Sequence, residues 1–369
     1  METTAAVLWE ANQPLSVEQI ELDAPGEGEV LLRMVAAGVC YSDHHFMTGR
    51  RTMRLPAVIG HEGAGIVEAV GPGVKGVSVG DHVVQTFVAP CGRCYRCRRR
   101  KFTYCEVGLG VADGTMMDGT FRMHRADRAI GTGMRLGSFS QFTVSPETAC
   151  VVVPSDIDLI HASLVSCGIS TGVGAAVNVA AVRAGDSVAV FGAGGVGAAA
   201  IAGAIAAGAA AVIAIDIADQ KLEMARSLGA THAVNARDTD SVRAVRQATG
   251  GYGVDKSILC IDVVRPEHLS AAIDCLDSGG TAVVVGAAES QLDHIPTSPA
   301  LLMRDSKSVV GTMYGGMDPH RDVLRYLELY RAGRLPLEKF VSKTYPLESI
   351  NESLDDLIAG RNIRGVVVF

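Results

Sequence analysis

Aromatic residues are scarce in this 369-residue chain: they make up 5% of it, and tryptophan occurs once. No Gly-X-Y repeat runs through the 42 glycines, which excludes a collagen-like structure, and a hydrophobic share of 48% excludes a disordered chain. Neither sign of charge dominates, because 33 lysines and arginines face 40 aspartates and glutamates. The formal net charge of −7 gives no overall attraction for nucleic acid or anionic lipid, so we expect neither partner.

Long runs of large apolar residues are also missing. Two uncharged stretches, Ala162 to Val182 and Ser187 to Ile215, consist mainly of Gly, Ala and Ser, and we expect no membrane span from either. The N-terminus lacks the basic and apolar regions of a secretory signal, which predicts a cytoplasmic protein. Nine cysteines in that compartment indicate metal binding, catalysis or packing rather than disulfides.

The length and the pattern of short elements predict two domains of different character. Up to about Val153, short strands alternate with Gly/Pro turns, which indicates a β-rich domain: Glu29–Val35, Gly65–Val70, His82–Gln85 and Phe139–Val144. After Pro154, strands alternate with helices such as Asp219–Leu228 and Pro266–Leu276, as expected for a parallel sheet in an α/β domain: Ser187–Phe191, Val212–Asp216, Asp255–Ile261 and Thr281–Val285. A helix at about His320–Ala332 and short elements ending in Val366–Phe369 follow.

A glycine-rich turn follows the expected strand Ser187–Phe191 and precedes a helix-forming alanine run. It reads Gly192-Ala193-Gly194-Gly195-Val196-Gly197 and fits G-x-G-x-x-G. Gly192 suits a tight turn, Gly194 lets the backbone approach a pyrophosphate, and Gly197 permits close packing of helix on strand. A bare match is weak in a glycine-rich chain, but this one lies at a strand-to-helix turn, which predicts a dinucleotide site.

An acid at the end of the next strand indicates which dinucleotide binds. Asp216 lies 19 residues past Gly197, where a carboxylate can accept hydrogen bonds from the adenosine ribose and repel a 2′-phosphate. Ile217 and Ala218 follow it, so no arginine is present there to bind NADP. We expect NAD(H); the alternative is a plain glycine-rich turn with a helix-capping aspartate.

Four cysteines form the first metal-binding pattern. Within fifteen residues the chain has C-x2-C-x2-C-x7-C, formed by Cys91, Cys94, Cys97 and Cys105. Four thiolates close a tetrahedral zinc shell without an open position, as structural zinc sites require. An iron–sulfur cluster is the main alternative, but the spacing fits neither common ferredoxin pattern.

A second set of metal-binding residues is dispersed along the chain, with Cys40, the pair His61-Glu62, and Cys167. Two thiolates and one imidazole leave a fourth position for water or substrate, as in catalytic zinc sites. Glu62 is either a transient fourth ligand or a neighbouring acid, and Asp43 either orients His61 or caps a turn. Each residue taken alone is as well explained by packing.

The whole chain resembles the zinc-dependent medium-chain alcohol dehydrogenases. The resemblance rests on G-V-C-x-S-D, G-H-E-G-A-G, the four cysteines, G-D-H-V, C-G-x-S-T-G and G-A-G-G-V-G. It implies a GroES-like, β-rich catalytic domain at 1–178, with a structural zinc lobe at about 90–106. It also implies a Rossmann domain with a doubly wound parallel sheet at 179–318 and a return to the catalytic domain at 319–369.

The same resemblance assigns roles to single residues. It implies two zinc ions per chain, a catalytic one held by Cys40, His61 and Cys167 and a structural one held by Cys91, Cys94, Cys97 and Cys105. It places Ser42 and His45 on the proton path. Substrate-pocket or nicotinamide-side residues are Phe87, Tyr104 and Thr171. Cofactor contacts are Gly192, Gly194, Gly195, Val196, Gly197, Asp216, Lys221 and Arg364. The family often has a basic residue at position 41, whereas this chain has Tyr41.

The expected reaction is the reversible oxidation of an alcohol to an aldehyde or ketone by hydride transfer to NAD, with zinc as Lewis acid. Ser42-Asp43-His44-His45 and Tyr314-Gly315-Gly316 also resemble a bacterial group assayed with a nitrosoaniline dye, which implies an NAD that does not readily leave. A thiol-dependent formaldehyde dehydrogenase is the alternative enzyme. The family resemblance and the expected strand Ser308–Thr312 suggest a homodimer or homotetramer.

A non-enzyme alternative is a zinc-stabilised scaffold or nucleic-acid binder, suggested by the basic residues around the four cysteines, which run from Arg93 to Lys101. It would leave the set Cys40, His61, Cys167, Ser42 and His45 unexplained. A solvated loop explains the basic residues better.

Overall fold

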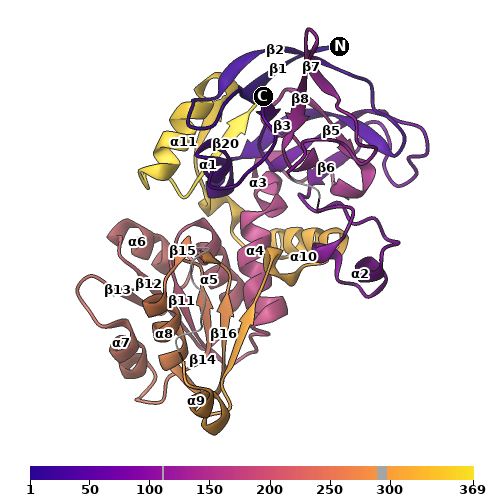
Figure 1. Cartoon of the computed structure of the whole chain (residues 1–369). Coiled ribbons are helices and arrows are strands. Elements are labelled where there is room, and N and C mark those ends of the chain that lie inside the picture. The colour runs from indigo at the N-terminus through magenta and orange to yellow at the C-terminus, as the bar shows by residue number, and fades with distance from the viewer. Residues whose placement is uncertain (110–111, 289–296) are drawn as a thin grey trace. The chain divides into compact units, whose positions relative to one another are not determined.

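The computed structural model describes residues 1–109, 112–288 and 297–369. The chain divides into two compact units. The first unit comprises Met1–Cys167, Asp318–Leu327 and Leu337–Phe369, and the second comprises Gly168–Met317 and Glu328–Pro336. The indigo N-terminal and yellow C-terminal segments both belong to the first unit (Figure 1). The domain ends expected at 178 and 318 stay a prediction.

The first unit is built from strands. A closed barrel runs in the order β1 (Glu2–Leu8), β2 (Ser16–Leu22), β7 (Met123–Arg125), β8 (Arg128–Thr132) and β4 (Ala57–Val58). A seven-stranded sheet has the order β10 (Cys150–Val153), β6 (His82–Gln85), β5 (Glu62–Val70), β3 (Glu29–Gly38), β20 (Arg364–Val368) and β19 (Val341–Pro346), and β9 (Phe142–Pro146) also pairs with β3. The C-terminal strand is therefore an internal strand of this sheet.

Helices of the first unit are short, apart from α11 (Ile350–Ile358). Helix α10 (Pro319–Arg331) belongs to the first unit up to Leu327 and to the second unit from Glu328. The others named below are α1 (Tyr41–Met47), α2 (Tyr95–Arg98) and α3 (Leu159–Ser163). One apolar cluster joins the barrel, the sheet and α11 through buried residues such as Leu8, Phe139 and Leu354. Ala37 of β3 and Phe46 of α1 belong to this core, which therefore fixes the elements on either side of Cys40.

The second unit contains a six-stranded parallel sheet. Its order is β13 (His232–Asn235), β12 (Ala211–Asp216), β11 (Ser187–Phe191), β14 (Val254–Leu259), β16 (Leu276–Val284) and β18 (Ser308–Gly311). The chain moves outward from β11 to β13 and then crosses to β14 on the other side of β11. That reversal creates the point at which doubly wound sheets bind their ligands.

Helices pack on this sheet as expected for a Rossmann fold (Figure 1). They are α5 (Gly195–Ala207), α6 (Asp219–Ser227), α7 (Ser241–Ala248) and α8 (Pro266–Asp274), with α9 (Pro299–Arg304) later in the chain. Helix α5 consists only of Gly, Ala, Val and Ile, and most of it is buried. A helix that is apolar on all sides belongs in a core. It packs most closely on α4 (Gly168–Gly174), a helix of the same unit.

No single helix in the described ranges is long and apolar enough to cross a membrane. One bent pair, Leu159–Ser166 with Gly168–Val179, passes by length and composition, and most of its residues are buried inside the protein.

Candidate active site

The four-cysteine set comes together in a lobe around α2. The sulfur atoms of Cys91, Cys94, Cys97 and Cys105 all lie within 4.8 Å of one another. Backbone N–H groups point at them: Cys94 N lies 3.4 Å from Cys91 Sγ, and Gly108 N lies 3.2 Å from Cys105 Sγ. The backbone N–H of Cys97 is the main cause that lowers the pKa of Cys94 to about 6.

This environment suits a closed metal site. Hydrogen bonds from backbone N–H groups favour the thiolate form, and thiolates are the form that binds metal. Four sulfur donors within one shell fit tetrahedral zinc without an open position. The donor set therefore fits the structural zinc predicted from the spacing.

The dispersed set also comes together, entirely within the first unit. Cys40 caps the N-terminus of α1, His61 and Glu62 lie at the start of β5, and Cys167 follows the short 3-10 helix Leu164–Ser166. Their ligand atoms lie within 4.8 Å of one another. Cys40, His61 and Glu62 are 6%, 1% and 0% exposed, so these polar groups have left water and need one another or a metal ion.

Asp43 holds His61 in position. Asp43 Oδ1 lies 3.0 Å from His61 Nδ1, and Asp43 Oδ2 accepts from the backbone N–H of Cys40 at 3.0 Å. The other ring nitrogen, His61 Nε2, is buried and has no hydrogen-bond partner among the described residues. A histidine with one nitrogen bound to a carboxylate and the other facing two thiols fits a metal ligand.

The electrostatics of this set depend on shared protons and burial. A hydrogen bond from Cys167, helped by Arg364 and His61, holds the pKa of Cys40 well below its usual value and raises that of Cys167. Burial disfavours a charged His61, but Asp43 outweighs it and holds the pKa of His61 well above normal. Protons concentrated on one cluster of ligand atoms can be released when a cation binds. The residues therefore fit a zinc ion with an open position.

Arg364 lies beside this cluster. It is 3% exposed, its Nη1 donates to the Val39 carbonyl at 3.2 Å, and its Nη2 lies 3.4 Å from Glu62 Oε1. Burial raises the pKa of Glu62 to about 7, although Arg364 opposes that shift. Sequence reasoning missed this pair, because residues 62 and 364 lie on β5 and β20, two strands that flank β3 in a sheet that only the fold defines.

Ser42 and His45 lie on α1, immediately after Cys40. Residues three apart on a helix share a face, so both side chains follow one side of a helix whose N-cap is a cluster residue. Both are half-buried, and the His45 ring centroid lies 6.4 Å from that of His44. This arrangement gives a hydroxyl and an imidazole in one short helix next to the cluster.

The expected pocket residues lie in three different surroundings. The Phe87 ring meets the His61 ring edge-on, with centroids 6.0 Å apart. Tyr104 is 36% exposed and lines a surface pocket of about 520 Å³ with Tyr95, Arg96 and Lys101. Thr171 is half-buried on α4 in the second unit. Phe87 therefore makes a ring contact with a cluster residue.

The glycine-rich turn joins β11 to α5. Gly192 has a φ of +86°, and a Cβ on Gly197 would lie 1.7 Å from the Gly192 carbonyl oxygen, so neither position tolerates a side chain. No atom lies within 4 Å of the place where a Cβ on Gly194 would be, which leaves the backbone open at the N-cap of α5. Open backbone at a helix N-terminus fits a pyrophosphate.

Asp216 ends β12 and turns back toward this loop. Its Oδ2 accepts from Ala193 N at 2.8 Å, and its Oδ1 accepts from Ile217 N and Ala218 N at 2.8 and 3.0 Å. The carboxylate is therefore fixed beside the glycine-rich turn, as an acid that binds ribose would be. The other expected cofactor residues, Gly195, Val196 and Lys221, are half-buried at the start of α5 and on α6.

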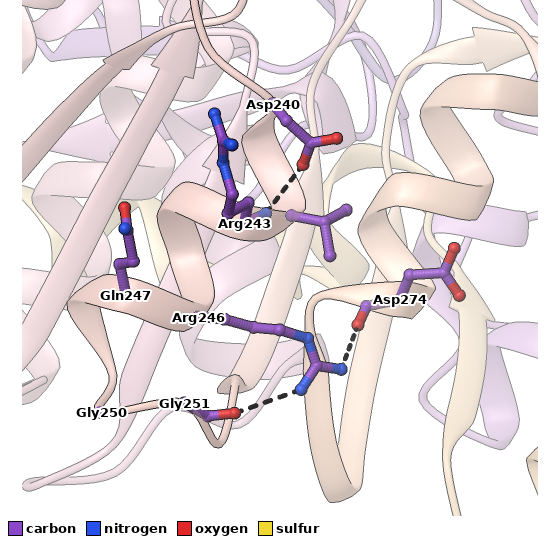
Figure 2. A pocket seen from close by; sticks show the side chains of 8 residues that line it. Asp240, Arg243, Arg246, Gln247, Gly250, Gly251 and Asp274 are labelled. Carbon is purple, nitrogen blue, oxygen red and sulfur yellow. Dashed lines mark hydrogen bonds between the residues drawn. The ribbon is translucent and has the colours of Figure 1, made fainter.

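A separate pocket of about 650 Å³ lies at α7 in the second unit (Figure 2). Arg246 crosses it and donates to the carbonyl oxygens of Gly251 and Asp274. The pocket contains none of the predicted site residues. Arg243 and Arg246 both line it, and the guanidinium of Arg246 is bound to backbone carbonyl oxygens.

Comparison with known proteins agrees with this geometry. The family model described as "Alcohol dehydrogenase GroES-like domain" matches residues 26–155, and the one described as "Zinc-binding dehydrogenase" matches residues 195–330. The chain is 41% identical to the NDMA-dependent alcohol dehydrogenase of Amycolatopsis methanolica, covering 100% of this chain and 99% of the relative. It is 40% identical to putative alcohol dehydrogenase D of Mycobacterium tuberculosis, with full coverage of both.

A solved structure supports the same assignment. The alcohol dehydrogenase zinc-binding domain protein of Burkholderia ambifaria superimposes with a TM-score of 0.93 at 37% identity, covering 100% of this chain and 99% of the other. Two matching family models, full-length relatives and the two metal-binding clusters all agree. The chain belongs to the zinc-dependent medium-chain alcohol dehydrogenase family.

Proposed function

We propose that this enzyme oxidises a small alcohol to an aldehyde or ketone, reversibly, at the site formed by Cys40, His61 and Cys167, with NAD(H) bound at the glycine-rich turn. The observation that carries this assignment is the buried cluster of two thiols and an imidazole that Asp43 orients. Zinc and NAD(H) are the cofactors of the family. When bound, zinc supplies a Lewis acid and NAD⁺ supplies the hydride acceptor.

The residues of the chain prepare and complete this chemistry. Asp43 fixes the ring of His61 so that Nε2 faces the two sulfur atoms. As Ser42 Oγ accepts the hydroxyl proton of the alcohol it gives up its own, along a path that ends at His45, three residues further along α1, from which a proton passes to solvent. Histidine suits this second step because its ordinary pKa lies near neutrality. Phe87, whose ring meets that of His61 edge-on, would supply an apolar neighbour on that side of the histidine.

The remaining assignments concern binding. Cys91, Cys94, Cys97 and Cys105 would hold a second, structural zinc. Asp216 would select NAD(H) over NADP(H), because its fixed carboxylate repels a 2′-phosphate. Thr171, Val196, Lys221 and Arg364 would complete the cofactor site, and Phe87 with Tyr104 would contact the alcohol.

The relative named for its dependence on NDMA supports a further point about the cofactor. We propose that NAD stays bound through catalysis in this chain too, and is reoxidised in place by an external acceptor. Such retention requires only slow release: at an association rate of ~10⁶ M⁻¹s⁻¹, a nanomolar complex releases its cofactor about once in a thousand seconds. Typical turnover is far faster.

One experiment tests these assignments together. Protein purified without added cofactor is expected to contain about two zinc ions and nicotinamide dinucleotide, and alcohol should reduce that nucleotide in a single turnover. An artificial acceptor should then restore cycling, whereas added NAD should not. Cycling on free NAD by protein isolated without nucleotide would place the chain among the exchanging dehydrogenases. Oxidation of formaldehyde only in the presence of a low-molecular-weight thiol would favour the thiol-dependent alternative.

We also propose a homodimer or homotetramer in the cytoplasm. β18 is an edge strand of the six-stranded sheet in the described part of the chain, and its residues are exposed or half-buried. An edge strand offers unpaired backbone groups to a second copy. Light scattering after chromatography tests this assembly, and an unchanged mass after replacement of Val310 by proline would contradict pairing through β18.

A further inference from the structure

Three consecutive residues between β18 and α10 have a left-handed backbone. Tyr314, Gly315 and Gly316 have φ angles of 55°, 61° and 59°. Left-handed residues normally occur singly, and a bulky side chain such as Tyr314 disfavours that region. Tyr314 is nevertheless 3% exposed, so the strained turn is packed into the protein. Strain of this kind persists only where the surroundings hold it, and it gathers at functional sites.

The turn is held by helix α4 of the same unit. A Cβ on Gly315 would lie 2.6 Å from the Ser170 carbonyl oxygen and 2.7 Å from that of Thr171. From the other direction, a Cβ on Gly174 would lie 2.5 Å from the Gly315 carbonyl oxygen. The Asn178 amide also donates to that oxygen, at 3.4 Å. Backbone therefore touches backbone here, without room for one methyl group.

The opposite side of α4 makes an equally close contact with α5. A Cβ on Gly172 would lie 2.1 Å from the Val196 carbonyl oxygen and 2.6 Å from the Ala199 Cβ. Residues 172 and 174 point in nearly opposite directions around a helix. Helix α4 is thus clamped between the left-handed turn and the first turn of α5, which begins at the glycine-rich loop. A π-helical segment, Ala175–Val179, follows at once, as often happens where a helix is held at a functional site.

We propose that the left-handed turn 314–316 is a positioning element for the nicotinamide end of the cofactor. Gly315 presses α4 onto α5 and so fixes Thr171 relative to Val196, the two residues that would flank the nicotinamide. Neither Gly315 nor Gly172 needs to touch the cofactor for this effect. The inference rests on the proposed function, since it assumes that NAD binds at the glycine-rich turn. In this proposal, NAD leaves slowly because the backbone around its nicotinamide end is closely packed, and not because charged side chains hold it.

The test compares alanine substitutions that separate contact from strain. Gly315→Ala adds a methyl that meets α4 and strains the backbone. Gly279→Ala, at a φ of +78° with no atom within 4 Å, adds comparable strain without contact. We expect Gly315→Ala to raise the Kd of NAD at least tenfold and to speed its dissociation by a similar factor, whereas the Gly279→Ala control changes either value less than twofold.

Gly174→Ala keeps the inference testable if Gly315→Ala does not fold. It inserts a methyl into the same contact from the α4 side, and Gly174 has no left-handed φ to strain. The same loss of NAD affinity is expected, with zinc content unchanged at about two per chain, as measured by calorimetry on nucleotide-stripped protein and by elemental analysis. Wild-type Kd and dissociation rate in a folded Gly174→Ala or Gly315→Ala protein would overturn the inference. A wild-type protein without NAD affinity would instead contradict the proposed function.

Discussion

Replacing Asp216 by asparagine removes one charge from the cofactor site and leaves the shape of the side chain almost unchanged. The asparagine oxygen can still accept from Ile217 N and Ala218 N, as Oδ1 does now. The bond from Ala193 N to Oδ2 would be lost, which weakens the binding of any dinucleotide. That loss applies equally to NAD and NADP, so the ratio of their kcat/KM values isolates the effect of charge.

The size of the effect follows from Coulomb's law. Asp216 is 8% exposed, so water screens it poorly. A phosphate charge about 6 Å from it, at an effective dielectric constant of about 20, is opposed by roughly 3 kcal/mol, a factor of about 100. We expect the unaltered enzyme to prefer NAD by at least that factor and Asp216→Asn to prefer it by tenfold or less.

Steady-state kinetics, or binding titrations on nucleotide-stripped protein, with both dinucleotides would measure this ratio. Asp219→Asn is the matched control, because Asp219 is an exposed acid in the first turn of α6 and solvent screens its charge. It should change the ratio less than about threefold. Equal use of NAD and NADP by the unaltered enzyme, or an unchanged ratio in Asp216→Asn, would refute the reasoning.

Three further predictions concern metal, proton transfer and stability. Cys94→Ser should lower the zinc content from about two to about one per chain. It should also lower the temperature of unfolding, because closed sites contribute folding energy. An unchanged zinc content on elemental analysis would show that Cys94 is not a ligand of the structural zinc. His45→Gln should slow alcohol oxidation by roughly 10–100-fold, most strongly below neutral pH, where too little hydroxide is present to take the proton in place of His45. An unchanged pH–rate profile would exclude His45 from the proton path. Arg122→Met should cost about 3–5 kcal/mol in urea unfolding, because it leaves Glu29 buried without the guanidinium that now contacts both its oxygens at 2.7 and 3.0 Å. The exposed pair of Arg33 and Glu68 is the control, and Arg33→Met should cost no more than about 1 kcal/mol.

Strands with strong β-branched patterns could be placed from sequence almost to the residue. His82–Gln85 and Ser187–Phe191 are strands with those bounds in the structure. The strand expected at Thr281–Val285 instead begins at Leu276, because Asp-Ser-Gly-Gly looks like a turn. Pairing of Leu276 with Val254, past a register shift, keeps this irregular stretch in the sheet. The start of this strand is thus set by its pairing with β14, and the local sequence pattern gives no sign of that pairing.

The two metal-binding sets differed in how far sequence could define them. Cys91 to Cys105 lie so close in the chain that spacing alone predicts a common site. Cys40, His61 and Cys167 are separated by 21 and 106 positions, and only a resemblance could group them before the fold was known. The contacts of Arg364 with Glu62 and of Gly315 with α4 had no local signal, since each depends on segments that meet only in three dimensions.

The internal position of β20 has a consequence for the order in which the protein matures. Of the strands in this sheet, β20 is the last in chain order, and it lies between β3 and β19. At about 5–20 residues per second, the chain from 318 to 369 takes roughly 3–10 s to synthesise. During that time the second unit is already complete apart from residues 328–336, while Glu62 still lacks the cation supplied by Arg364. A nascent chain that has not yet reached Arg364 therefore contains the whole set of Cys40, His61 and Cys167, but in a sheet that still lacks β20.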